Sequence, residues 1–384
     1  MGDELERRVR NLHEAPFDLD SVKGTAMKIR TKRRAAVAGG LLAAAAVVVP
    51  IAVIDPAQTP SQTATDPVVD PVDPEDPPAA GPALGFTYIE MGSGNAVLHL
   101  DDGSRIELPG PDYTGAAVLG DQVAAFRSTE DGQGAVDLVE DQAVTTTYEV
   151  RPPVAIAPDG RTIALITDDD ELLVLNGEAG EQSFGAVDPD AVLAAFIGNG
   201  DCSLETGCHP FLEYGDLERE PFEVNYEGPD TRPVPGALRL NDAADGFLVT
   251  AQVSSSDIGS CGGLYDREGG GAVVFETCDS QVLDISPTGD FVAGTDPYGD
   301  GLGPTYFSIL DRTGDEVARY EVERGFVYVD LAWSDDTHVV ASVYQDAQWR
   351  VVSLGVDGAS EVVLGPVDGT EMLNPFQVTG GYTG

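Results

Sequence analysis

The sequence predicts an all-β fold, a seven-bladed β-propeller preceded by a single transmembrane helix and a Pro-rich linker. Three observations lead to this prediction. From residue 83 onward, short runs of β-branched and aliphatic residues alternate with Gly/Asp turns. A strand–turn–strand pattern recurs there every 40–47 residues, which is the length of one four-stranded blade. A long uncharged stretch with basic residues before it precedes this region.

The first 54 residues predict a cytosolic tail (1–34) and a membrane anchor (35–54). Residues 35–54 carry no charge, and a helix of that length spans about 30 Å, the thickness of the hydrocarbon layer. The preceding KIRTKRR (28–34) is strongly basic, so the positive-inside bias places the tail in the cytosol and the rest outside. A cleaved signal peptide is the alternative, but it normally has a shorter apolar core and a small-x-small cleavage site.

Residues 55–82 predict an extended, disordered stalk. Eight of them are proline, and Asp, Thr, Ala and Val make up most of the rest. Proline fixes φ and removes a backbone donor, so such a segment favours polyproline-like conformations over packed structure. The stalk therefore separates the membrane from a domain at 83–384.

The clearest copies of the repeat define the proposed blades. They are VAIAPDGRTIALIT (154–167), VLDISPTGDFVAGT (282–295) and VDLAWSDDTHVVAS (329–342), with weaker copies at 115–126, 194–204 and 238–249. Each has an apolar strand, a tight polar turn and a second apolar strand. Pro, Asp and Gly suit the corners of such a turn because they preset φ, cap the local backbone and accept positive φ.

The two ends of the domain predict how the ring closes. Only one strand fits at 375–379, whereas 86–91, 96–102 and 104–110 resemble three strands with no partner before them. One C-terminal strand plus three N-terminal strands completes a blade and removes the exposed edges of an open array. Residues 84–384 then divide into seven blades of about 43 residues each.

The segments VAIAPDG, LDISPTGD and LAWSDD resemble the blades of WD40-like (TolB-type) β-propellers. The Trp-Asp and Gly-His signatures of classical WD40 repeats are missing, so the resemblance concerns the fold alone. The layout also resembles membrane-anchored propeller proteins of actinobacteria, with a charged tail, an Ala-rich span, a Pro/Asp stalk and an acidic propeller. Some similar tails are encoded beside alternative sigma factors, but His13 has no Cys near it to form a zinc-binding anti-sigma motif.

The four cysteines, Cys202, Cys208, Cys261 and Cys278, all follow the predicted anchor. An even number of cysteines in an exported domain indicates disulfides. Three connectivities are possible, and the local one (Cys202–Cys208 and Cys261–Cys278) closes two short loops. A zinc site is the less favoured alternative, because CSLETGCH offers at most three ligands.

Few residues predict a ligand or metal site. Asp296 and Asp300 in DPYGDG are weak candidates for a cation, since the spacing lacks the alternating ligands of a calcium loop. Tyr214 and Tyr226 are weak ligand-binding candidates, because they flank a long irregular segment. Trp333 and Trp349 lie in predicted strands, where core packing is favoured over a ligand platform.

The net charge and the absence of one catalytic motif reduce the number of function classes to consider. A net charge of −45 argues against a nucleic-acid partner, and no G-x-S-x-G motif occurs. The leading hypothesis is a non-enzymatic propeller without a cofactor, displayed outside the membrane to bind or sense a protein, glycan or other ligand. The first alternative is a transmembrane regulator whose tail (1–34) binds a cytosolic factor such as a sigma factor. The second is an exported hydrolase or lactonase.

Overall fold

In the computed structural model, the described residues are 83–384 without 93, 130–132, 158–159, 178–179, 199–206, 225–230, 245–247, 257–258, 267–271, 298–302, 380–381 and 384. The predicted tail (1–34), transmembrane helix (35–54) and stalk (55–82) therefore lie outside the described residues. Within the described part, no helix is long and apolar enough to span a membrane.

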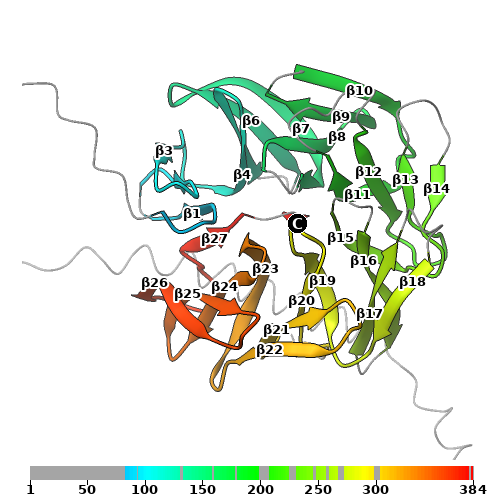
Figure 1. The fold of residues 1–384 in the computed structure, drawn as a ribbon. Helices are drawn as coiled ribbons and strands as arrows, with labels where there is room; N and C mark the ends of the chain where they lie inside the picture. Colours follow the sequence, from blue (N-terminus) through cyan, green and yellow to red (C-terminus); the bar gives the residue numbers. More distant parts are fainter. Residues whose placement is uncertain are drawn as a thin grey trace, which may run out of the picture. The chain divides into compact units, whose positions relative to one another are not determined.

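The described chain is all-β and forms a ring of sheets, as Figure 1 shows. Five sheets have four strands each, and we call these the blades. The blade that closes the ring has the order β27-β1-β2-β3, with β1 (Tyr88–Glu90), β2 (Val97–His99), β3 (Arg105–Glu107) and β27 (Phe376–Val378).

The other four blades each consist of strands that are consecutive in the chain. The first contains β11 (Ala191–Ile197), β12 (His209–Tyr214), β13 (Phe222–Val224) and β14 (Thr231–Pro233). The second contains β15 (Arg239–Ala244), β16 (Leu248–Ser256), β17 (Gly259–Asp266) and β18 (Ala272–Thr277). The third contains β19 (Gln281–Ile285), β20 (Phe291–Thr295), β21 (Tyr306–Asp311) and β22 (Glu316–Glu321). The fourth contains β23 (Gly325–Asp335), β24 (His338–Gln345), β25 (Gln348–Gly355) and β26 (Ser360–Asp368).

The predicted count of seven blades is wrong, because residues 113–186 form one eight-stranded sheet instead of two blades. Its strands are β4 (Tyr113–Leu119), β5 (Gln122–Ser128), β6 (Gly134–Glu140), β7 (Ala143–Ile156), β8 (Thr162–Thr167), β9 (Glu171–Asn176), β10 (Gly180–Ala186) and the C-terminal β28 (Tyr382–Thr383). The physical reason is the length of β7. It pairs with β6 through its first half and with β8 through its second half, so no break separates the two halves.

The predicted closure is confirmed. β27 pairs antiparallel with β1, with Tyr88 opposite Val378 and Glu90 opposite Phe376. The Met91 N–H donates to the Pro375 carbonyl at 2.8 Å just beyond this pairing. The C-terminal strand and the three N-terminal strands therefore share one blade, and the ring has no open end there.

Buried side chains lie between neighbouring sheets and hold the ring together. Phe196 and Leu212 of β11 and β12, for example, pack with Leu172 and Val174 of β9. Both faces of most sheets are covered, which explains the runs that are apolar at every position, such as residues 163–166. Trp349 is fully buried, as the core interpretation predicted.

The turn chemistry predicted from the repeats is also present. Gly160 and Gly289 have φ of 67° and 72°, a conformation that residues with a side chain rarely adopt. Their N–H groups donate to the carbonyls of Ala157 and Ser286 at 2.8 and 2.7 Å, which closes each turn. These turns follow the innermost strands and therefore fix where each of those strands ends.

Candidate functional site

One position on the innermost strands distinguishes two blades from the other sheets. It is the second residue of the repeated segments AAVL, VAIA, AAFI, NDAA, LDIS and LAWS, and it is occupied by Ala117, Ala155, Ala195, Asp242, Asp284 and Ala332. Each of these residues pairs with the second strand of its own repeat: Ala117↔Ala124, Ala155↔Ala164, Ala195↔Phe211, Asp242↔Thr250, Asp284↔Ala293 and Ala332↔Val340. The four alanines are buried, so carboxylates replace small apolar side chains in two adjacent blades.

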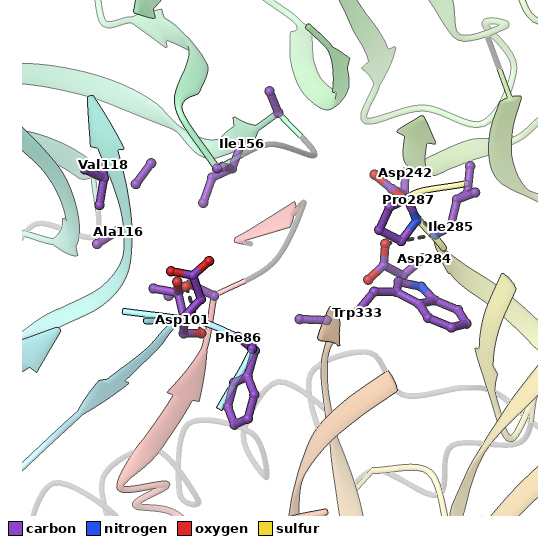
Figure 2. Close-up of a pocket in the computed structure, with 17 residues that line it drawn as sticks. Phe86, Asp101, Ala116, Val118, Ile156, Asp242, Asp284, Ile285, Pro287 and Trp333 are labelled. Carbon is purple, nitrogen blue, oxygen red and sulfur yellow. Dashed lines mark hydrogen bonds between the residues drawn. The ribbon is translucent and has the colours of Figure 1, made fainter. Parts of the chain in front are cut away.

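The two aspartates line two cavities enclosed by the innermost strands, which we call the central channel. The first has a volume of about 240 Å³ and is also lined by Asp101, Ile156 and Trp333. Figure 2 shows Asp242 and Asp284 together on one side of this cavity and Asp101 across from them. The second has a volume of about 420 Å³ and is lined by β15, β19 and β23. Asp242 and Asp284 therefore border both parts of the channel.

Asp242 and Asp284 form a hydrogen-bonded carboxyl pair. The Ile285 N–H donates to Asp242 Oδ2 at 3.0 Å and to Asp284 Oδ1 at 2.9 Å. Burial raises the pKa of both carboxyls, and the adjacent Asp242 carboxylate further raises the pKa of Asp284, well above its ordinary value. Of the two carboxyls, Asp284 is therefore the one that more readily holds a proton, which it can donate to Asp242.

Asp330 is the third carboxyl of the channel, and it lines the larger cavity. Burial raises its pKa to about 7. No hydrogen bond or ion pair joins the side chain of Asp330 to any group in the described part of the chain. Asp330 is half-buried, and a carboxyl that has lost part of its water contacts without gaining a partner is less stable in its ionised form.

The rest of the larger cavity is amphipathic. Leu283, Leu331 and Tyr328 supply apolar surface, and Val329 is 55% exposed at its wall. Among the described residues, no arginine or lysine lines either cavity. The channel therefore offers carboxyl groups beside an apolar surface, with no described basic side chain to neutralise them.

The cysteines agree with the predicted disulfides where the structure describes them. Cys261 and Cys278 are bonded, which is one of the pairings that the sequence left open. Cys208 is also disulfide-bonded, and Cys202 lies outside the described residues.

The predicted cation candidates are not brought into a described site. Asp296 accepts a hydrogen bond from the Thr305 hydroxyl at 2.7 Å, and Asp300 lies outside the described residues. Within the part that the structure describes, no three ligating side chains of Asp, Glu, His or Cys lie close enough to hold one metal ion.

The predicted ligand candidate Tyr214 lies at the end of β12, away from both cavities. Its ring packs against Phe222, and the Arg219 guanidinium carbon lies 3.5 Å from its centroid. Arg219 in turn forms ion pairs with Asp188 and Asp216. This face of Tyr214 is already covered, and Tyr226 lies outside the described residues.

The described histidines belong to separate sheets. His99, His209 and His338 pair with Glu90, Glu223 and Asp335 at 3.0, 2.8 and 3.0 Å, respectively. None of the three lines either channel cavity. The described histidines therefore take no part in the channel, whose titratable groups are carboxyls and tyrosine.

Sequence reasoning missed Asp242, Asp284 and Asp330. The first two lie inside recognised repeats, and their signal was the replacement of Ala by Asp at one repeat position. Asp330 lies two residues before Ala332, outside the aligned repeat position. Comparing the repeats with one another therefore does not single out Asp330 as unusual.

The strand order and the channel define a β-propeller. No protein family and no curated protein matches the sequence. Among solved structures, the β-propeller domain of Cps50 (Swd1) from Myceliophteria thermophila is 13% identical, with 67% of this chain and 88% of that chain covered and a TM-score of 0.43. A functionally unknown protein from Desulfotomaculum acetoxidans is 12% identical, with 78% and 98% covered and a TM-score of 0.47. BamB from Moraxella catarrhalis is 16% identical, with 74% and 83% covered and a TM-score of 0.38. Similarities this distant carry no argument about function.

Proposed function

We propose that this chain is a non-enzymatic binding or sensing module that holds its ligand in the central channel. The observation that carries the proposal is the larger cavity of about 420 Å³, bordered by Asp242, Asp284 and Asp330. This volume lies in the range of small-molecule sites, and convergent polar groups beside an apolar wall are typical of such sites. Asp242 Oδ2 accepts the Ile285 N–H of the neighbouring blade, so Asp242 joins two blades as well as lining the cavity.

The location is part of the same proposal. The uncharged segment 35–54 and its basic flank favour a single-pass membrane protein with residues 1–34 in the cytosol. The stalk then presents the propeller outside the membrane. The Cys261–Cys278 bond supports this location, because disulfides persist in oxidising compartments.

The carboxyl pair supports binding more than glycoside hydrolysis. Glycosidases hold their two carboxyls about 5–9.5 Å apart, so that a sugar and, in some enzymes, a water fit between them. Asp242 and Asp284 are instead hydrogen-bonded to one another.

A steric block of the channel tests the proposal. Full-length protein is purified from native membranes in detergent, and the retained small molecules are identified by mass spectrometry. Val329→Trp fills the wall of the larger cavity from a residue that is 55% exposed. Val362→Trp is the matched control, because Val362 is 47% exposed on the outermost strand of the same blade. We expect Val329→Trp to lose a retained compound that the wild type and the control keep; identical profiles in all three would refute channel binding.

A second candidate function, hydrolysis by the carboxyl pair, is favoured by one observation. Two hydrogen-bonded carboxyls with different tendencies to hold a proton can provide an acid and a base side by side. This candidate predicts turnover of an ester or lactone by the full chain and its loss in Asp284→Asn. Equal turnover by the wild type and Asp284→Asn would rule out hydrolysis by the carboxyl pair.

A further inference from the structure

The charge balance of the larger cavity indicates what its ligand carries. Three carboxyls, those of Asp242, Asp284 and Asp330, line this cavity, and the pKa of about 7 leaves Asp330 about half ionised at neutral pH. No described Arg or Lys lines the cavity, so this charge has no protein counterion there. A partly buried charge without a partner destabilises the fold, and a cationic ligand would supply the missing counterion.

The walls favour an organic cation over a metal ion. The cavity of about 420 Å³ is far larger than a bare ion, and Leu283, Leu331 and Tyr328 supply surface for a hydrocarbon chain. No described group of three ligating side chains lies close enough to hold one metal ion, so the carboxyls do not converge on a single point. An apolar wall, with a carboxyl pair at one place and Asp330 at another, matches an ammonium group on an alkyl chain.

We propose that the channel binds a small primary alkylammonium compound, with its ammonium group against the Asp242–Asp284 pair and its hydrocarbon part along Leu283 and Leu331. Asp330 provides the contact for a second ammonium group, so a diamine binds more tightly than a monoamine. This inference rests on the proposed function, because it names the ligand class of that same channel site. The net charge of −45 also raises the concentration of cations near the protein and speeds their encounter with the channel.

The test uses isothermal titration of detergent-solubilised full-length protein with three probes. They are 1,4-diaminobutane, butylamine and 1,4-butanediol, the last being similar in length to the diamine but uncharged. We expect the diamine to bind most tightly, butylamine to bind more weakly, and the diol not to bind. Asp284→Asn and Asp330→Asn should each weaken diamine binding at least about tenfold, because a hydrogen bond to a charged group is worth that much or more. Glu361→Gln removes one charge from the exposed strand β26 and should leave the affinity unchanged.

The pH dependence of diamine affinity is a second measurement, and it would not change if Asp330 had only a structural role. The titratable groups that line the cavity with Asp330 are Asp242 on β15, Asp284 on β19 and Tyr328 on β23. Burial, and next the charge of Asp330, raise the pKa of Tyr328 from 10.0, so it stays neutral in this range. Because Asp330 must ionise to pair with an ammonium group, diamine affinity should rise between pH 6 and 8 in the wild type and much less in Asp330→Asn.

The outcomes separate this inference from the function on which it rests. Failure of both amines to bind, equal binding of the diol, or unchanged affinity in Asp284→Asn and Asp330→Asn would each overturn the amine assignment. Channel binding would still stand if Val329→Trp lost the compound that Val362→Trp retains. If those two variants retained the same compounds, the proposed function itself would fail.

Discussion

At the scale of single residues, the channel contains an ionisable side chain, Asp330, at a place where a neutral side chain would make the folded state more stable. Asp330 lines the larger cavity, and its side chain has no described partner. Side chains that destabilise a fold are commonly retained at functional sites, where binding needs a charge that the free protein holds at a cost. Its substitution should therefore affect stability and ligand binding in opposite directions.

The first prediction concerns the stability of the ligand-free protein. The pKa of Asp330 rises from 3.8 to about 7 on folding, so the native state binds more protons than the unfolded state between those values. The free energy of unfolding therefore falls as pH rises through this window. Asp330→Asn removes that loss and should stabilise the protein by about 1–3 kcal/mol at pH 8 and by almost nothing at pH 3.5. Thermal melts of both proteins at the two pH values measure this, and equal stability at pH 8 would contradict a raised pKa of Asp330 in the folded protein.

Asp137 is the opposite case, a buried carboxylate whose partners are complete. It is 2% exposed and accepts hydrogen bonds from Tyr113, Arg127 and Thr147 at 2.7–2.8 Å. Burial on its own would raise the pKa of Asp137, but these hydrogen bonds outweigh it and lower the pKa.

The second prediction is that Asp137→Ala lowers the free energy of unfolding by about 3–5 kcal/mol, because it leaves the Arg127 charge and two hydroxyls without their acceptor. The exposed neighbour Asp112 supplies the control, and Asp112→Ala should change stability by less than about 0.5 kcal/mol. Urea unfolding measures both. A loss no larger than that of the control would show that the network contributes little.

At the scale of elements, β27 determines whether the ring closes. Phe376 and Val378 are 6% and 2% exposed and pack in the cluster that also contains Tyr88 and Trp349. Most of the strand's stabilising contacts are therefore with residues distant in sequence.

The third prediction is that Phe376→Ala destabilises the whole propeller by about 3–5 kcal/mol, the usual cost of truncating a buried aromatic side chain. Leu373→Ala is the matched control, since Leu373 lies three residues earlier and is 72% exposed. Calorimetry should show one transition shifted to lower temperature for Phe376→Ala and no shift for Leu373→Ala. A separate early transition would mean that the closing blade unfolds independently of the ring.

Comparison of particular elements shows how far the sequence predicts this molecule. The repeat and its Gly or Asp turns identified the strands around 154–167, 282–295 and 329–342, because alternation and turn chemistry are local properties. The pairing of β27 with β1 was predicted from unpartnered strands at both ends. The continuity of β7 was not predicted. Pro152 and Pro153 favour the end of a strand, but β7 pairs with neighbouring strands both before and after these two residues.

The site depends on relations that no local pattern contains. Asp242 and Asp284 are 42 residues apart in the sequence and meet only because β15 and β19 are neighbouring innermost strands. Asp330 joins their cavity through a third such strand. The sequence shows that Asp replaces Ala at one repeat position in two repeats. It does not show that these two positions are in contact, because that contact depends on how the sheets are arranged in the ring.

At the scale of the whole molecule, the dominant feature is a net charge of −45 on 384 residues. Acidic side chains outnumber basic ones by 66 to 21, so most carboxylates have no basic side chain available to pair with them. Their mutual repulsion acts across the folded surface and is relieved when the chain expands. Stability should therefore depend on salt through general screening as well as through individual ion pairs.

The fourth prediction is that the melting temperature of the full-length protein rises by about 3–6 °C between 0.01 M and 1 M NaCl. The Debye length falls from about 30 Å to about 3 Å over this range, so repulsion between distant carboxylates is removed. The few surface ion pairs, such as Arg324 with Asp346 at 3.2 Å, are weakened by the same salt but contribute little each. Scanning calorimetry at pH 7 measures the change, and choline chloride at the same ionic strength tests whether the effect is screening. A melting temperature that stays constant or falls in both salts would mean that repulsion does not limit the stability of this propeller.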